Sequence, residues 1–259
     1  RFLAPDFVMA EELPAEPPST LPPMDVKYTP HFKLRDVENG EYRRRLPSGV
    51  YAKTDPSWIE KAGYNGQISG SMNPAYRYAG GYVHTSYSLL GAPKAALWNT
   101  HREWFWPRDG DGTATGQLCW ANASLVATVT EQVKKLLRGN PGARVVSVSQ
   151  MDAFNFCNDT AEFAIAQEEG TPGGSLLRAV NAIADSIQGE FPYALVDTLA
   201  YQWTRTAPKA TRPRPNVLIR LCSTQCNTAV PFTDPSNFAF QTDLKAWAAI
   251  AEGPIIIWD

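Results

Sequence analysis

The chain has 259 residues, of which 44% are hydrophobic and 19% charged, so it is long and apolar enough to bury the core of a globular domain. Its formal net charge of −2, from 24 basic and 26 acidic residues, excludes the strong basic bias that is typical of nucleic-acid-binding proteins and gives no general attraction to anionic membranes. No apolar run approaches the roughly 18 residues that are needed to cross a bilayer.

Prolines recur through the first part of the chain. Because proline lacks a backbone N–H and fixes φ, few places there suit a helix or a central strand. We therefore expect an extended arm over residues 1–30 and one folded domain over residues 31–259.

The first strand that bears on function is opened by two glycines and runs from Gly80 to Tyr87. It places His84 near its end. His84 either contacts a ligand there or is buried and hydrogen-bonded to the backbone.

From residue 116 onward, strand and helix patterns alternate. Residues 116–121 predict a strand, and Asn122 is typical of the N-cap of a helix with one apolar face. That helix is expected to end at Gly139 and Pro141.

The next strand is the most informative stretch of the sequence. It is rich in β-branched residues and ends in the polar residues Gln150 and Asp152, before an aromatic loop that contains Cys157. In a parallel β/α sheet or barrel, ligands gather at the carboxyl ends of the strands. Asp152 is therefore a candidate functional residue, and its alternative role is to cap the next helix or turn.

The second half of the chain continues the alternation. A long connection over residues 153–174, which contains Glu168 and Glu169, is expected to be a functional loop. The expected elements that follow are a helix from Ser175 to Ile187, a strand over residues 193–201, a strand over residues 216–222, a helix over residues 238–251 and a strand over residues 255–259.

Repeated strand–helix units with apolar strands predict a parallel sheet that is covered on both faces. The sequence has no GxGxxG, GxxxxGK[ST] or GxSxG motif, so we expect no nucleotide cofactor and no nucleophilic serine of the elbow type. We therefore favour an α/β fold of the TIM-type β/α barrel over a doubly wound sheet. Because the chain stops on the strand that carries Trp258 and Asp259, we expect the last units of the barrel to lie outside this chain or to come from a partner chain.

Four cysteines allow three complete disulfide pairings, and the sequence does not choose among them. The candidates are Cys119, Cys157, Cys222 and Cys226. A zinc site is an alternative, but the cysteines contain no CxxC pair and the three histidines show no ligand spacing, so we expect no metal. The sequons at Asn122 and Asn158 are candidate glycosylation sites and favour an extracellular or secretory location.

Short pieces spread over nearly the whole chain resemble domain-of-unknown-function family forty-eight thirty-eight, a glycoside-hydrolase-like barrel family. The pieces are Arg1–Pro5, His84–Thr85, His101–Phe105, Gln117–Cys119, Val146–Asp152, Cys157, Glu169–Gly170, Thr198–Tyr201, Asn216–Val217, Leu221–Cys222, Cys226 and Ile257–Asp259. The family is similar in architecture to α-glucuronidases and β-hexosaminidases, so the resemblance implies an eight-stranded β/α barrel and a carbohydrate ligand.

The chain departs from the family pattern in three places. Members usually read Gln-Asn-Asp where this chain has Met151 between Gln150 and Asp152, and they usually carry further cysteines soon after Cys157. They also usually continue beyond the pair Trp258 and Asp259.

Glycoside hydrolysis needs two carboxyl groups that flank the scissile bond. On this hypothesis Asp152 is the acid or the orienting carboxylate, Asp259 is its partner, and Glu168 and Glu169 are alternates. The expected contacts to sugar hydroxyls or to a sugar carboxylate are Arg35, His84 and Tyr201, with Trp258 as a stacking floor. Asp197 lies in mid-strand, where we expect a buried, hydrogen-bonded group.

The rival hypothesis is a non-catalytic carbohydrate-binding or structural extracellular protein on a degenerate barrel. A third hypothesis is that the chain is a subunit of a larger assembly.

Overall fold

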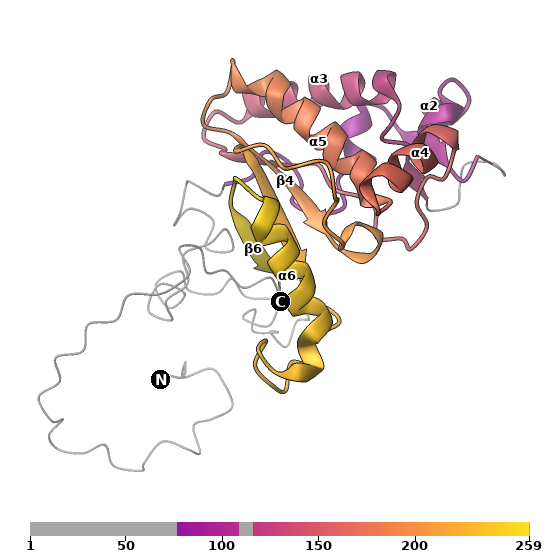
Figure 1. The fold of residues 1–259 in the computed structure, drawn as a ribbon. Coiled ribbons are helices and arrows are strands. Elements are labelled where there is room, and N and C mark those ends of the chain that lie inside the picture. The colour runs from indigo at the N-terminus through magenta and orange to yellow at the C-terminus, as the bar shows by residue number, and fades with distance from the viewer. Residues whose placement is uncertain (1–76, 109–115, 259) are drawn as a thin grey trace, which may run out of the picture. The chain divides into compact units, whose positions relative to one another are not determined.

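The computed structural model describes residues 77–108 and 116–258 (Figure 1). The chain divides into two units, residues 1–76 and 77–259, and only the second contains described residues. The predicted arm over residues 1–30, Arg35 and Asp259 therefore lie outside the described residues.

A four-stranded parallel sheet organises the described part, in the order β3-β4-β5-β6. Its strands are β3 (Val145–Ser147), β4 (Leu195–Ala200), β5 (Val217–Cys222) and β6 (Ile255–Trp258). A parallel bridge between Tyr78 and Val145 extends the sheet beyond β3. Each strand thus pairs with the strand that follows it in the chain.

This sequential order is that of a singly wound sheet, as in a β/α barrel, whereas a doubly wound sheet reverses its order at a switch point. Within the described residues β6 is an edge strand and the sheet stays open. The structure therefore confirms a mixed α/β fold with a parallel sheet, and no closed barrel is seen among these residues.

The strand register gives the two faces of the sheet different chemistry. Val146, Val196 and Val217 pair in one row and face the helices. In the next row Ser147 pairs with Asp197, on the opposite face. The helix side is therefore an apolar core, whereas polar groups lie on the other face.

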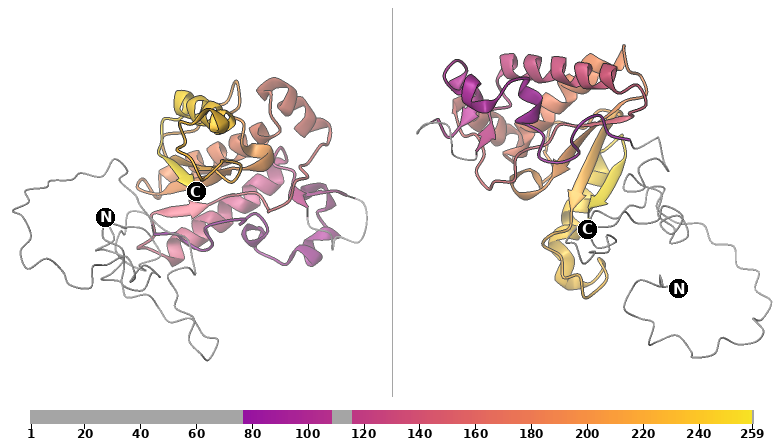
Figure 2. Two further views of the ribbon diagram at one scale, coloured as in Figure 1. Left: turned by 90° about the horizontal axis from the view of Figure 1, so that it is seen from below. Right: turned by 180° about the vertical axis from the view of Figure 1, so that it is seen from behind.

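Two long helices cover the apolar face: α3 (Ala123–Gly139) and α5 (Gly173–Gln188). They pack against each other and lie on one side of the strands, as the right-hand view of Figure 2 shows. The predicted N-cap of α3 is confirmed, because Asn122 Oδ1 accepts hydrogen bonds from the amides of Ser124 and Leu125. A third helix, α6 (Phe238–Ile250), connects β5 to β6.

The prediction of a long loop over residues 153–174 is wrong in part, because this segment contains helix α4 (Thr160–Glu169). Its side chains invert the usual pattern: Glu162 and Glu169 are buried, whereas Phe163 is 52% exposed. Since no apolar stripe marks the inner face, hydrophobic periodicity does not detect this helix.

The remaining elements are short. They are η5 (Ser88–Leu90), α2 (Lys94–Trp98), η6 (Arg102–Trp104), β1 (Phe105–Trp106), β2 (Gln117–Leu118), η7 (Gln202–Thr204) and η8 (Pro235–Asn237). The strand expected over residues 80–87 is wrong: this segment forms bends and turns, and the bridge to β3 is made before it, at Tyr78. None of the helices in the described part is long and apolar enough to cross a membrane.

A buried ion pair holds the polar face of the sheet together. Asp197 of β4, fully buried as expected, pairs with Arg220 of β5, which also donates to the Tyr78 hydroxyl. Burial disfavours the charge on Arg220, but Asp197 nonetheless raises its pKa above the ordinary value. The guanidinium lies over the rings of Tyr78, Tyr82 and Trp258, at 5.4, 5.5 and 5.5 Å from their centroids.

Candidate functional site at the strand ends

The carboxyl ends of neighbouring strands bring together three of the predicted site residues. Asp152 follows β3, Tyr201 follows β4, and His84 reaches the same edge from the segment beside β3. Because the strands are parallel, their carboxyl ends lie at one edge of the sheet, where ligand sites of β/α folds are found.

Asp152 is exposed, and one of its two carboxylate oxygens accepts hydrogen bonds from neighbouring side chains. Its Oδ1 accepts hydrogen bonds from the Tyr201 hydroxyl at 3.3 Å and from Gln202 Nε2 at 3.1 Å. No residue that the structure describes donates to Oδ2 or forms an ion pair with Asp152. The carboxylate is thus oriented on one side and open on the other.

His84 is half-buried near Tyr201, which binds this carboxylate. Its Nδ1 lies 2.8 Å from the carbonyl oxygen of Gln150, and since a carbonyl only accepts, Nδ1 carries the proton. In the neutral ring Nε2 is then an acceptor. The imidazole centroid is 6.3 Å from that of Tyr201, so the two rings border the same space.

The backbone is strained at the same place. Among the described residues, His84 and Gln202 are the non-glycine residues with positive φ, at 51° and 53°. Such conformations cost roughly 1–3 kcal/mol each and cluster at functional sites. Both belong to the group around Asp152.

Buried polar atoms without a hydrogen-bond partner also gather here. Gln150 uses its Nε2 to bond the carbonyl of Tyr201 and the hydroxyl of Thr204, but its Oε1 has no hydrogen-bond partner among the described residues. The neighbouring Asn155 Oδ1 and Gln202 Oε1 are in the same condition. Unsatisfied buried polar groups are rare in native proteins, and water or a ligand is a usual partner.

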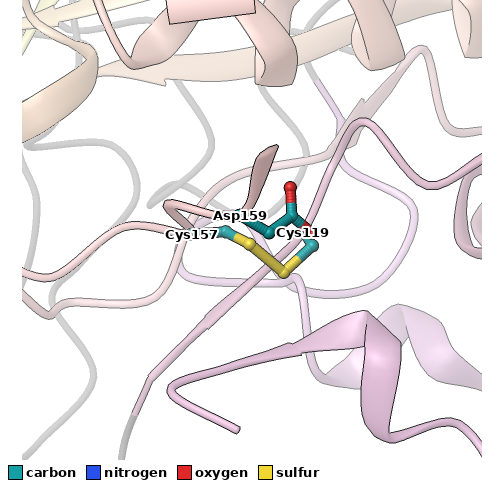
Figure 3. Close-up of side chains that lie close together, drawn as sticks. All are labelled: Cys119, Cys157 and Asp159. Atoms are coloured by element: carbon teal, nitrogen blue, oxygen red, sulfur yellow. A yellow bond between two sulfur atoms is a disulfide. The ribbon is translucent and has the colours of Figure 1, made fainter. Parts of the chain in front are cut away.

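The disulfide pairing is settled for two of the four cysteines. Cys119 is bonded to Cys157, whereas Cys222 is buried and Cys226 half-buried near the end of β5. Figure 3 shows Asp159 beside the disulfide, where it pairs with Arg108.

Together, Cys119, Cys157 and Asp159 are the group of side chains in the described part whose ligand atoms lie close enough to hold a metal ion. Because the two sulfurs are bonded to each other, they offer no thiolate to a metal.

Glu169 lies elsewhere, at the end of α4, and is fully buried. Burial alone would raise the pKa of its carboxyl, but hydrogen bonds from Thr211, Arg178 and the Ala210 amide lower it to about 2. Every one of these bonds joins α4 to other elements of the fold. We therefore assign Glu169 a structural role; its neighbour Glu168 forms a surface ion pair with Arg178 at 2.8 Å.

Trp258 ends β6, with its ring against the guanidinium of Arg220. Sequence reasoning missed Gln202, whose amide contacts Asp152, and Phe154, which is 84% exposed two residues after Asp152. The aromatic loop after β3 was the signal for Phe154, whereas a lone glutamine after a strand carries no signal.

Two hollows lie away from Asp152. A groove of about 620 Å³ runs between α3 and α5 on the helical side, with Ala127 and Ala182 in its walls. A space of about 20 Å³ lies at the end of β5, lined by Cys222, Ser223 and Cys226 among others.

The parallel sheet, with helices on one face and a polar cluster at the carboxyl ends of its strands, makes this an α/β protein. Comparison of the sequence with known families identifies the family. The family model "Domain of unknown function (DUF4838)" matches residues 8–259, so the chain belongs to this family. The resemblance inferred from the sequence is thereby confirmed.

No curated protein matches the sequence. Among solved structures, the chain is similar to a GH36 alpha-galactosidase AgaA variant from Geobacillus stearothermophilus in complex with raffinose. The identity is 9% and the TM-score 0.26, and the match covers 62% of this chain and 26% of that protein. The chain thus spans about a quarter of that enzyme's length.

Proposed function

We propose that the strand-end cluster around Asp152 binds carbohydrate and that the protein is a glycoside hydrolase built on a β/α barrel. The observation that carries the proposal is Asp152 itself: an exposed carboxylate at the carboxyl edge of a parallel sheet, held at Oδ1 and open at Oδ2. Backbone strain at His84 and Gln202 and the unsatisfied atom of Gln150 support the same location.

In this proposal Asp152 acts as the acid that protonates the leaving oxygen, or as the carboxylate that orients an acetamido group of the substrate. Tyr201 and Gln202 fix its orientation through Oδ1, which leaves Oδ2 for the substrate. The candidate for the second carboxyl group is Asp259, which directly follows β6 in the sequence.

The groups that would hold the sugar are neutral or basic. The Nε2 of His84 accepts a hydrogen bond from a hydroxyl, and Arg35 is the candidate partner for a sugar carboxylate. Phe154, exposed beside Asp152, offers an aromatic face to the apolar side of a sugar ring, in addition to the predicted Trp258.

The test is turnover of a panel of aryl glycosides that includes uronides and N-acetylhexosaminides. Asp152→Asn is expected to lower kcat by roughly 10²–10⁴-fold, because it removes the group that transfers the proton. The matched control is Glu252→Gln, an exposed acid just before β6 at the opposite edge of the sheet, which should leave kcat unchanged. Equal turnover of the wild type and Asp152→Asn would remove Asp152 from the mechanism.

The second candidate is a carbohydrate-binding protein without catalysis. The observation that favours it is that both donors to Asp152, the Tyr201 hydroxyl and Gln202 Nε2, are neutral. A carboxylate held in this way can accept a hydrogen bond from a sugar hydroxyl without taking part in catalysis. Sugar binding that Asp152→Asn weakens, with no hydrolysis of any glycoside, would select this function.

An oxidising compartment is part of the proposal. The Cys119–Cys157 disulfide and the sequons at Asn122 and Asn158 fit an extracellular or secretory-pathway protein. A mobility shift on removal of N-linked glycans from the natively expressed protein would test the sequons.

A further inference from the structure

The backbone on both sides of Asp152 is held by one buried side chain, Gln117 of β2. Its Oε1 accepts a hydrogen bond from the Met151 amide at 3.1 Å, and its Nε2 donates to the carbonyls of Met151 at 2.9 Å and Ala153 at 3.0 Å. Because the Met151 backbone amide can only donate, the oxygen of the Gln117 side chain, and not its nitrogen, must face it.

This contact replaces a strand partner. The chain leaves the sheet after β3, so the backbone around Asp152 has polar groups that no neighbouring strand pairs, and Gln117 satisfies three of them. Gln117 is 0% exposed, whereas Asp152 is exposed, so the amide acts from beneath the loop and not from the ligand side.

A second attachment lies two residues after Gln117 on one side and four residues after Ala153 on the other. Cys119, which follows β2, is bonded to Cys157 at the far end of the same loop. The loop that carries Asp152 and Phe154 is thus held near its start by Gln117 and at its end by the disulfide.

We propose that Gln117 is a positioning residue for Asp152, which sets the place of its carboxylate without touching the substrate. The expected effect of Gln117 on turnover rests on the proposed function, whereas its effect on the position of the loop around Asp152 does not. A displacement of about 1 Å in a catalytic group can lower turnover by about 100-fold.

The variant Gln117→Met keeps the length and apolar stem of the side chain but removes all three hydrogen bonds. It is expected to lower kcat on a hydrolysed aryl glycoside by about 100-fold, with KM changed by less than about threefold. The control is Leu118→Val, in the neighbouring position of β2, which also loosens packing but touches neither Met151 nor Ala153. Its kcat per folded molecule should equal that of the wild type.

Amide hydrogen exchange supplies a readout that does not depend on activity. In Gln117→Met the amides of residues 151–153 should exchange at least about tenfold faster than in Leu118→Val, while α5 stays protected. Gln117→Asn, which keeps the amide group but is one methylene too short to make all three bonds, should show a smaller increase and so covers the case in which Gln117→Met folds poorly.

Exchange that is unchanged at residues 151–153, or that rises equally over the whole sheet, would overturn the role of Gln117. A kcat loss in Leu118→Val as large as that in Gln117→Met would overturn it as well. If the wild type hydrolyses no glycoside, the proposed enzymatic function fails, and the exchange measurement alone decides whether Gln117 positions Asp152.

Discussion

The hydroxyl of Tyr201 donates to Oδ1 of Asp152 over 3.3 Å and so links the ends of β4 and β3. Burial raises the pKa of Tyr201, and the nearby Asp152 carboxylate contributes to the rise. The phenol therefore keeps its proton through the neutral range, and the bond has a fixed direction from Tyr201 to Asp152.

Removing this donor should weaken but not abolish the function of Asp152. Gln202 continues to hold Oδ1 in the variant Tyr201→Phe, so we expect kcat to fall by about 5–30-fold, which corresponds to a charge-assisted hydrogen bond of about 1–2 kcal/mol. The check is to compare the steady-state kinetics of Tyr201→Phe with those of Tyr193→Phe, a control at the opposite edge of the sheet. Equal rates for Tyr201→Phe and Tyr193→Phe would contradict the assigned contact.

Phe154 is predicted to contribute to sugar affinity and not to stability. Its side chain is 84% exposed, so Phe154→Ala should leave the free energy of unfolding within about 0.5 kcal/mol of the wild type. Loss of one stacking face should weaken binding by about tenfold, as measured by calorimetry. Tyr193→Ala, which removes an aromatic ring that is 46% exposed, should not change the affinity. An affinity that is unaffected in Phe154→Ala would exclude a stacking role.

Glu169 should be needed for stability and not for turnover. Its carboxyl pKa is lowered to about 2 in the folded protein, against 4.5 ordinarily, so the ionised group contributes about 3 kcal/mol of stability above pH 5. This contribution is lost as the pH falls from about 5 to about 2, because the unfolded chain takes up the proton first.

The variant Glu169→Gln is therefore expected to unfold about 3 kcal/mol more easily at pH 7, and the difference from wild type should shrink by about half at pH 3. Urea denaturation at the two pH values measures both quantities. Glu168→Gln, whose side chain is 59% exposed, is the neighbouring control and should change stability little. A large fall in kcat for folded Glu169→Gln would restore Glu169 as a catalytic candidate.

The disulfide should contribute strongly to the stability of the described part. It joins residues separated by 38 positions, and in the chain-entropy model such a loop is worth about 4 kcal/mol. The double variant Cys119→Ala/Cys157→Ala should lose up to that amount in urea denaturation. Reductant should destabilise the wild type but not the double variant; equal sensitivity of both proteins would mean that the bond does not form in solution.

The regular part of this fold could be predicted from the sequence because its signals are local. The strand over residues 193–201, the strand over residues 216–222 and the N-cap at Asn122 all correspond to elements that the structure contains. Apolar runs, β-branched residues and a capping side chain act within one element, so a single sequence reveals them.

What the sequence did not reveal depends on tertiary contacts. Helix α4 buries Glu162 and Glu169, and their partners lie elsewhere in the chain: the Ala121 amide binds Glu162, and Thr211 binds Glu169. No periodicity in α4 encodes such contacts.

The candidate site shows the same division. Asp152 and Tyr201 could be proposed because they follow apolar strands, and the structure brings them together with His84. The contributions of Gln202 and Gln117 arise from a strained turn and from a strand that is distant in sequence, and neither leaves a pattern of its own.

The most direct test of the central claim is an NMR titration of the histidine side chains with glycosides. The chain has three histidines: His84 contacts Gln150 and lies near Tyr201, which binds Asp152, whereas His101 is stacked on Trp104 with centroids 4.0 Å apart. A carbohydrate site at the strand ends predicts that a bound glycoside shifts the imidazole resonances of His84 and leaves those of His101 in place. Binding that shifts His101 alone, or no shift of His84 with any glycoside at millimolar concentration, would contradict a carbohydrate site around Asp152.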